Sequence, residues 1–166
     1  MGHFATGITV VTTRDRIGQP CGITVNSFAS LSLSPPLVQW SMKANSFSWP
    51  IFAAAHMFAV NILSADQEAI CRNFCKPHDR FADVECEDGL DGLPLIRSCV
   101  AWVECARDSI IEGGDHWIIV GRVLRARTFE RMPLLYWRGR YLRIPDIEPT
   151  ADEYTYYSEL STIGTG

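Results

Sequence analysis

The chain has 166 residues, which is enough for one domain with a core that needs no disulfide or metal to fold. Apolar residues make up 47% and charged residues 20%, proportions that are ordinary for globular proteins and argue against disorder. The net charge of -4 argues against a nucleic-acid partner, and no apolar run approaches the roughly 20 residues of a membrane-spanning helix. We therefore expect a protein that binds neither nucleic acid nor a membrane.

The six cysteines raise a choice between disulfides, a metal site and free thiols. They are Cys21, Cys71, Cys75, Cys86, Cys99 and Cys105. The first residues carry no basic and apolar leader, so we expect a cytoplasmic location in which thiols stay reduced. Only Cys71 and Cys75, followed by His78, have the spacing of metal ligands, and a second close pair for a closed zinc site is missing. We expect free thiols and no metal, with zinc at this cluster as the alternative.

In chain order, the first half of the sequence predicts strands rich in Ile, Val and Thr. The expected strands cover residues 4–13, 21–28, 31–33 and 37–42. A turn-forming segment separates the first two strands, which is the pattern of a β-hairpin. Asn45 or Ser46 is then expected to cap a short helix that ends near residue 55, with Pro50 in its first turns, where proline is tolerated.

In the second half, a buried strand over residues 58–63 leads into another helix. Ser64 and Gln67 form a capping-box pattern that predicts a helix to about residue 74. Residues 76–98 have no clear pattern and are expected to be irregular. The remaining expected strands cover residues 99–111, 117–128, 134–137 and 140–144. Short strands at this spacing, with two interposed helices, favour a closed β-barrel over a parallel sheet.

The composition changes beyond residue 144. Acidic side chains recur there, and no Lys or Arg follows Arg143. Without this segment the chain is slightly basic, so the negative net charge comes from its C-terminal end. We therefore divide the chain into a domain over residues 1–144 and an acidic C-terminal tail over residues 145–166.

Motifs for several kinds of chemistry are missing, and polar runs inside the strands are the first candidates for binding. The sequence has no glycine-rich phosphate loop, no Gly-x-Ser-x-Gly elbow and no His-Glu-x-x-His. One strand instead carries hydroxyl and amide side chains at Thr24, Asn26 and Ser27, with Ser30 just beyond. Such groups suit a planar polar ligand if they are exposed, and are costly in a core unless hydrogen-bonded. The alternative is a strand end with turn-forming residues.

Two further polar segments follow. Ser41, Lys43 and Ser46 lie where a strand is expected to run into a helix, a place that favours an anion, unless Ser46 is only a helix cap. His116 comes after two glycines that let a hairpin bend sharply or let a ligand come close. The alternative for His116 is a structural or merely exposed histidine.

Several short runs occur in an order that is typical of one known family. They are residues 4–13 (FATGITVVTT), 22–28 (GITVNSF), 30–37 (SLSLSPPL), 40–42 (WSM) with Ser46, 58–67 (FAVNILSADQ), 79–81 (DRF) and 114–116 (GDH). Across about residues 3–144 the chain resembles the flavin reductase-like, FMN-binding split-barrel proteins, which include the NAD(P)H:flavin oxidoreductase components of two-component monooxygenases. The resemblance implies a mainly β fold, namely a Greek-key split β-barrel with a few short helices.

The same resemblance implies an activity and a set of site residues. It implies a homodimer that binds FMN or FAD near the subunit interface, oxidises NADH or NADPH, and passes reduced flavin by diffusion to a partner monooxygenase. Matching positions imply contacts to the isoalloxazine and ribityl chain from Thr24, Asn26, Ser27 and Ser30. They also imply contacts to the phosphate from Ser41, Lys43 and Ser46, and flavin contacts from the loop residues Arg80 and Phe81. His116 matches the position that faces the nicotinamide and is the expected catalytic residue.

Three alternatives stay open at this point. The first alternative to a flavin reductase is an FMN-binding protein that serves as an electron carrier or that reduces a bound metal complex, such as a corrinoid. An oxidase of the related pyridoxamine-phosphate type is a second alternative, although it calls for more basic phosphate ligands than this sequence has. A non-enzymatic barrel that binds a small ligand is the third. Hydride transfer from nicotinamide to flavin N5 needs no protein nucleophile, which agrees with the absence of nucleophile motifs.

Overall fold

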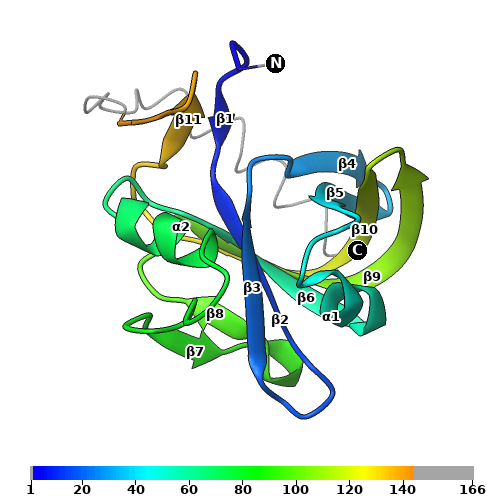
Figure 1. The fold of residues 1–166 in the computed structure, drawn as a ribbon. Helices are drawn as coiled ribbons and strands as arrows, with labels where there is room; N and C mark the ends of the chain where they lie inside the picture. Colours follow the sequence, from blue (N-terminus) through cyan, green and yellow to red (C-terminus); the bar gives the residue numbers. More distant parts are fainter. Residues whose placement is uncertain (1, 144–166) are drawn as a thin grey trace.

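The computed structural model describes residues 2–143, and its main element is a seven-stranded antiparallel sheet (Figure 1). The strands are β2 (Thr9–Arg14), β3 (Pro20–Val25), β4 (Ala29–Leu33), β5 (Pro36–Lys43), β6 (Met57–Ile62), β9 (Ala101–Gly113) and β10 (His116–Thr128). Their order in the sheet is β3-β2-β6-β9-β10-β5-β4. The sheet curls so that the edge strand β3 comes close to β5, and the expected mainly β fold is confirmed.

The sheet is split between its two edge strands, as the family resemblance implies, and it does not close as the strand spacing alone favoured. Among residues 2–143, β3 and β4 do not pair with each other, although only three residues connect them. The hydroxyl of Ser27 in this connection reaches across to β5. It donates to the carbonyl oxygen of Ser41 and accepts from the Ser41 N–H, both at 3.0 Å. The Ser27 side chain therefore attaches the β3–β4 connection to β5, at the place where β3 and β4 form no backbone hydrogen bonds with each other.

Smaller elements cover the sheet. They are β1 (Thr6–Gly7), α1 (Trp49–Ala54), α2 (Glu68–Phe74), β7 (Cys86–Asp88), the 3-10 turn η1 (Leu90–Gly92), β8 (Pro94–Ile96), β11 (Leu135–Trp137) and β12 (Arg140–Leu142). β1, β11 and β12 form one small sheet, and β7 and β8 form another. No helix within residues 2–143 has the length and apolarity needed to cross a membrane. The acidic tail at 145–166 lies outside the described residues, so the division of the chain stays a prediction.

Three local predictions need correction. α1 begins at Trp49 with Ser48 as its N-cap, because residues 43–49 form tight turns before the helix instead of the expected cap at Asn45 or Ser46. α2 begins only at Glu68. Half of the capping box is present, since the Ser64 N–H donates to Gln67 Oε1 at 3.0 Å, but the Ser64 hydroxyl lies 2.7 Å from the Ser98 carbonyl oxygen. Residues 76–98, expected to be irregular, contain β7, η1 and β8.

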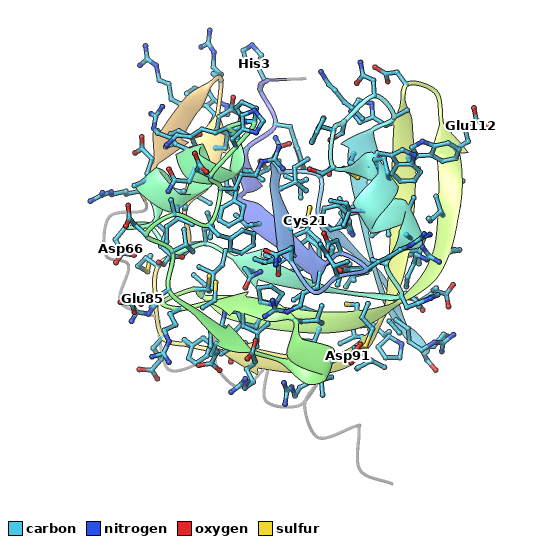
Figure 2. The ribbon with its side chains drawn as sticks, turned by 60° about the horizontal axis from the view of Figure 1, so that its bottom comes forward. His3, Cys21, Asp66, Glu85, Asp91 and Glu112 are labelled. Atoms are coloured by element: carbon cyan, nitrogen blue, oxygen red, sulfur yellow. The ribbon has the colours of Figure 1, made fainter. Side chains whose placement is uncertain are left out.

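The central strands are buried on both faces, which explains their continuous apolar sequences. On β2, Val10 points into one core and its neighbour Val11 into the other. The first core lies against α2 and β8 and contains Phe74, Leu95, Ile96 and Trp102. The second core fills the curl of the sheet beneath α1 and contains Val38, Trp40, Met42, Phe52, Phe58 and Ile119. Figure 2 shows Cys21 within the curl and Glu112 at the tip of β9.

Buried polar groups join the covering elements to the sheet. The side chain of Asn61 on β6 is fully buried. Its Nδ2 donates to the Val10 carbonyl oxygen and to Thr12 Oγ1, both at 3.0 Å, and its Oδ1 accepts from the Ile96 N–H at 2.8 Å. The Thr12 hydroxyl in turn donates to the Pro94 carbonyl oxygen at 2.6 Å. These bonds hold β8 against β2 and β6 where no strand pairing does so.

A buried carboxylate on β9 forms a second junction of this kind. Glu104 is 1% exposed, and it accepts hydrogen bonds from Arg125 Nε at 2.6 Å, Arg125 Nη2 at 2.9 Å and the Leu90 N–H at 2.6 Å. Burial by itself raises the pKa of Glu104, but the hydrogen bonds from Arg125 and Leu90 outweigh it and lower the pKa overall. The ionised form of Glu104 therefore contributes to the stability of the fold.

We expect Glu104→Gln to lower the free energy of unfolding by about 1–3 kcal/mol at pH 7, because it loses the charge that three N–H donors satisfy. The native contribution is present above the unfolded pKa of about 4.3 and is lost as the pH falls through the lower folded pKa. The difference in the free energy of unfolding between the unmodified protein and Glu104→Gln should therefore become smaller at acidic pH. Urea unfolding at several pH values measures it, with the exposed Glu85→Gln as control. A constant difference down to low pH would contradict this account.

Candidate functional site

One polar group lies on the outer face of the sheet, at the end of β5. Alternate residues of a strand face opposite sides, and Trp40 and Met42 are buried, so Ser41 and Lys43 face outward. The register pairs Lys43 with His116 at the start of β10, and paired residues share a face. The structure thus brings together three of the predicted site residues, Ser41, Lys43 and His116.

His116 is oriented by its neighbour. Nδ1 of His116 lies 2.7 Å from Oδ1 of Asp115, and since a carboxylate only accepts, Nδ1–H is the donor. This hydrogen bond, together with the charge of Lys43, lowers the pKa of Asp115. The Asp115 carbonyl oxygen also accepts from the Ala44 N–H at 2.9 Å, which fixes the hairpin end to β5. Nδ1 is thereby occupied, and Nε2 remains the ring nitrogen for other contacts.

The residues of the β3–β4 connection divide between the two faces. Ser27 is held on Ser41, as described above, and Asn26 next to it is exposed. Ser30 pairs with Val38, a core-facing residue, so Ser30 lies on the opposite face of the sheet from Ser41. The structure therefore separates Ser30 from the outer-face group. The two faces meet at the split edge of the barrel, where this connection lies.

A second group surrounds Arg80 in the loop after α2. Its Nη1 donates to the Gly22 carbonyl oxygen and to Ser48 Oγ, both at 2.7 Å, and its Nε donates to the Lys76 carbonyl oxygen at 2.6 Å. Ser46 belongs to the same region, because its Oγ accepts from the Ser48 N–H at 3.4 Å. Arg80 thus joins the loop, β3 and the start of α1, and much of its guanidinium is engaged by protein groups.

Phe81 and Thr24 are also tied to neighbouring elements. The rings of Phe81 and Phe74 meet edge to face with centroids 4.8 Å apart. The Phe74 ring lies so close to Gly22 that a Cβ there would come within 2.5 Å of it, so only glycine fits. The Thr24 hydroxyl donates to the Cys71 carbonyl oxygen at 2.9 Å. The roles predicted for Thr24, Arg80 and Phe81 in flavin binding stay predictions, and each has a packing role besides.

A tryptophan pair that the sequence reasoning missed connects the two groups. Trp49 and Trp117 stack in parallel, with centroids 5.0 Å apart and an angle of 2° between their planes. Trp49 follows Ser48 in the chain, and Trp117 follows His116. The stack therefore fixes the start of α1 against the start of β10. Its only signal in the sequence is that Trp117 adjoins the candidate residue His116.

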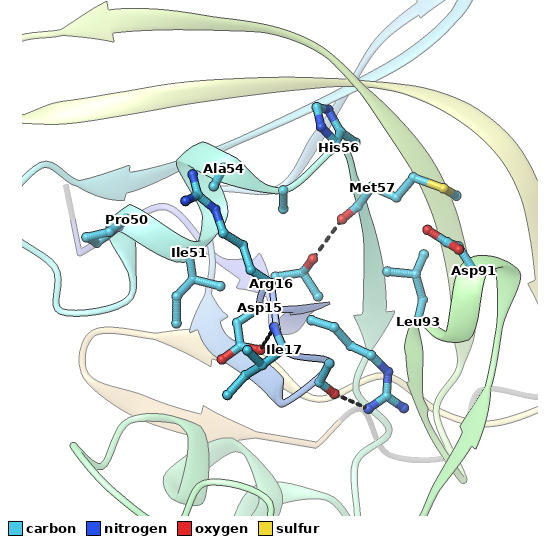
Figure 3. A pocket seen from close by; sticks show the side chains of 14 residues that line it. Asp15, Arg16, Ile17, Pro50, Ile51, Ala54, His56, Met57, Asp91 and Leu93 are labelled. Atoms are coloured by element: carbon cyan, nitrogen blue, oxygen red, sulfur yellow. Dashed lines mark hydrogen bonds between the residues drawn. The ribbon is translucent and has the colours of Figure 1, made fainter.

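A depression in the surface lies elsewhere on the chain (Figure 3). It has a volume of about 970 Å³ and is lined by the β2–β3 turn, α1 and the η1 region. Arg16, His56 and Asp91 are among its lining side chains, and none of the predicted site residues is. Of the predicted residues, Ser41, Lys43 and His116 instead lie on an open face of the single chain. The zinc alternative gains no support, since no three His, Cys, Asp or Glu side chains converge within residues 2–143.

Comparison with known proteins decides the family. The model of the "Flavin reductase like domain" matches residues 1–145. The chain belongs to this family. It is 44% identical to the FMN reductase (NADH) SmoA of Agrobacterium fabrum, covering 86% of this chain and 82% of that one. It is 38% identical to the flavin-dependent monooxygenase reductase subunit HsaB of Rhodococcus jostii, covering 88% and 76%.

Solved structures agree with this assignment. The NADH:FAD oxidoreductase SgcE6 of Streptomyces globisporus, in complex with NAD and FAD fragments, superposes with a TM-score of 0.83 at 40% identity, over 91% of this chain and 90% of that one. The styrene monooxygenase flavin reductase of Pseudomonas putida S12 gives 0.80 at 32% identity, over 88% and 95%. One relative from Rhizobium meliloti, 44% identical, is longer, and the chain spans 45% of it.

Proposed function

We propose that the chain is an NAD(P)H-dependent flavin reductase that transfers hydride from a nicotinamide to N5 of FMN or FAD. The observation that carries this proposal is the outer-face group, in which β5 and β10 place Ser41, Lys43 and His116 side by side on an exposed surface. Relatives at 38–44% identity with flavin reductase names support it. Such a reaction requires that two rings be held together, and it needs no covalent bond to a protein group.

The residues on this face fit a flavin and a nicotinamide. Lys43 is an exposed cation that suits a phosphate, and the hydroxyl of Ser27 and the amide of Asn26 suit a ribityl chain or ring edge. Backbone N–H groups between Asn26 and Ser30 suit the negative charge that develops at the N1–C2=O end of the ring. When bound, the flavin supplies the hydride acceptor. We assign to His116 the orientation of the nicotinamide carboxamide through Nε2, with Asp115 holding the ring.

We further propose that the site is completed by a second copy of the chain. The single chain leaves this face open, and apolar residues border the polar group. Ile118 pairs with Ser41 and Ile111 pairs with Ile118, which puts both isoleucines on the outer face, where Ile111 is 51% exposed. Leu31 and Leu33 on the edge strand β4 are also exposed. An isologous dimer would bury these residues and enclose the flavin.

We propose that the reduced flavin is used by a monooxygenase, because several relatives are reductase components of such enzymes. We also propose a cytoplasmic location. All six cysteines are free thiols, and a nicotinamide coenzyme is the electron donor. Mixing the purified protein with NADH or NADPH and with FMN or FAD, without oxygen, tests the activity directly. Bleaching of the flavin absorbance is the expected result, and no bleaching with any of the four pairs would refute the proposal.

Light scattering at micromolar concentration is expected to give twice the chain mass of 18.6 kDa. The dimer should persist with or without flavin, because the apolar border of the site supplies the contact area. Replacing Ile111 with Lys, at an exposed position of that border, should shift the mass toward the monomer. Leu124→Lys, also about half exposed but further along β10, is the control. A monomer mass with flavin bound would overturn the dimer proposal.

We expect Lys43→Ala to weaken FMN binding by about 1–3 kcal/mol, the contribution of one charge-assisted contact, which is roughly five- to 150-fold in Kd. Riboflavin lacks the phosphate, so its affinity should change much less. Titration of both ligands, followed by flavin fluorescence, compares the two losses. Arg16→Ala, which removes another exposed cation from a different face, should leave both affinities unchanged. Equal losses for the two ligands would exclude a phosphate contact at Lys43.

His116→Ala is expected to raise the KM for the nicotinamide and to slow flavin reduction by about tenfold or more, because the carboxamide loses its orienting contact. Flavin affinity and Tm should stay close to those of the unmodified protein. Stopped-flow reduction without oxygen, flavin titration and thermal melting on one preparation give the three values. The exposed His56→Ala is the control. Joint loss of Tm and flavin affinity would make His116 a structural residue, and an unchanged rate would remove it from the site.

A further inference from the structure

Two thiols lie one turn apart at the C-terminal end of α2, beside the Arg80 loop. Cys71 is buried, and Cys75, four residues later, is exposed. Residues four apart on a helix lie on one face. The Cys71 thiol also approaches Tyr141 of β12, with 3.4 Å between Sγ and Oη. The pair thus combines one accessible sulfur with one that is held inside the protein.

The helix is already unwinding at Cys75. The Cys75 N–H bonds to the Arg72 carbonyl oxygen at 3.2 Å. In an unbroken α-helix it would bond to the carbonyl of Cys71. That carbonyl accepts the hydroxyl of Thr24 instead. Cys75 therefore ends the helix and is not held in place by its ladder, so it has more freedom to approach Cys71 than a residue within a helix has.

The two thiols differ in acidity in the way that a reactive pair requires. A hydrogen bond from Cys71 lowers the pKa of Cys75 to about 6, helped by Thr24 and by the charges of Arg80 and Arg72. The same shared proton, together with burial, raises the pKa of Cys71. Cys75 is thus the more acidic thiol of the pair, and Cys71 is the one that keeps its proton more firmly. By contrast, burial raises the pKa values of the other four thiols, which are Cys21, Cys86, Cys99 and Cys105.

We propose that Cys75 is a peroxide-reactive site, with Cys71 as its resolving thiol, and that the disulfide they form slows the flavin reductase. The proposal rests on the proposed function, because reduced flavin that meets oxygen instead of its acceptor gives oxidised flavin and hydrogen peroxide. The Cys75 thiolate attacks the peroxide, which leaves a sulfenic acid on Cys75 and hydroxide. The Cys71 thiol then displaces the hydroxyl of that sulfenic acid, which forms the disulfide and releases water. The sulfur pair loses two electrons, and the peroxide gains them.

The disulfide would act on the site through the chain between Cys75 and Phe81. Bridged cysteines need Cβ atoms about 3.5–4.5 Å apart, which is closer than the roughly 5–6 Å between residues four apart on a helix. Bond formation therefore draws Cys75 toward Cys71. Arg80 is bonded to the Lys76 carbonyl next to Cys75, and from there to Gly22 and Ser48. Movement at Cys75 thus reaches β3 and the start of α1.

The test treats the reduced 166-residue chain with graded hydrogen peroxide, removes the peroxide, and then measures three properties. These are the intact mass, the Cys71–Cys75 linkage by peptide mapping, and the rate of flavin reduction by NADH without oxygen. We expect the mass to fall by two hydrogens and the rate to fall by about tenfold or more. Dithiothreitol should restore both. Cys75→Ser should keep its rate after peroxide, and Cys71→Ser should carry a dimedone-reactive sulfenic acid on Cys75.

The control is Cys86→Ser, which changes a half-buried thiol and should respond to peroxide like the unmodified protein. If Cys75→Ser loses activity to peroxide as fast as the unmodified protein, the proposal is wrong. It is also wrong if the disulfide forms and the rate stays the same, or if no Cys71–Cys75 linkage forms. A protein that reduces no flavin even before peroxide would instead refute the proposed function, while the mass and the linkage still report on the thiol chemistry.

Discussion

The guanidinium group of Arg80 joins three parts of the chain that no strand pairing connects. It donates to the loop in which it lies, to the carbonyl oxygen of Gly22 on β3, and to the hydroxyl of Ser48 at the start of α1. Hydrogen bonds from a charged donor are stronger than neutral ones and have fixed directions. These hydrogen bonds fix β3, α1 and the loop relative to one another, and with them the shape of the surface at the split edge.

The rest of the fold leaves that surface free for polar groups. Because β2 and β6 are covered on both faces, two separate cores supply the stability of the sheet, and the outer face at β5 and β10 is not needed for it. The stack of Trp49 on Trp117 then holds the beginnings of α1 and β10 together. Rigid elements thus carry exposed polar residues, an arrangement suited to holding two planar rings in a fixed relation.

The sequence predicted well what depends on local pattern. Short runs of apolar residues at 10–11, 58–60 and 118–120 mark β2, β6 and β10. The order of the short sequence motifs identified the family, which the comparisons confirm. The prediction from sequence failed where contacts between residues far apart in the chain determine the structure. β7 and β8 form because Asn61 and Thr12 satisfy β8 from other strands. A bulge between Ser30 and Ser32 decides which face Ser30 occupies, and no single-sequence pattern reveals it.

The chemistry of hydride transfer explains why the family and its activity could be predicted from the sequence although the arrangement of the site residues could not. The reaction needs position and no nucleophile, so the residues proposed for it are ordinary Ser, Asn and Lys side chains with no distinctive local motif. Two features bring the members of the proposed site together, namely the register that sets Lys43 opposite His116 and the hydroxyl that joins Ser27 to Ser41. Both are properties of the folded sheet. A sequence pattern therefore identifies the members of such a site, while the sheet alone decides which of them act together.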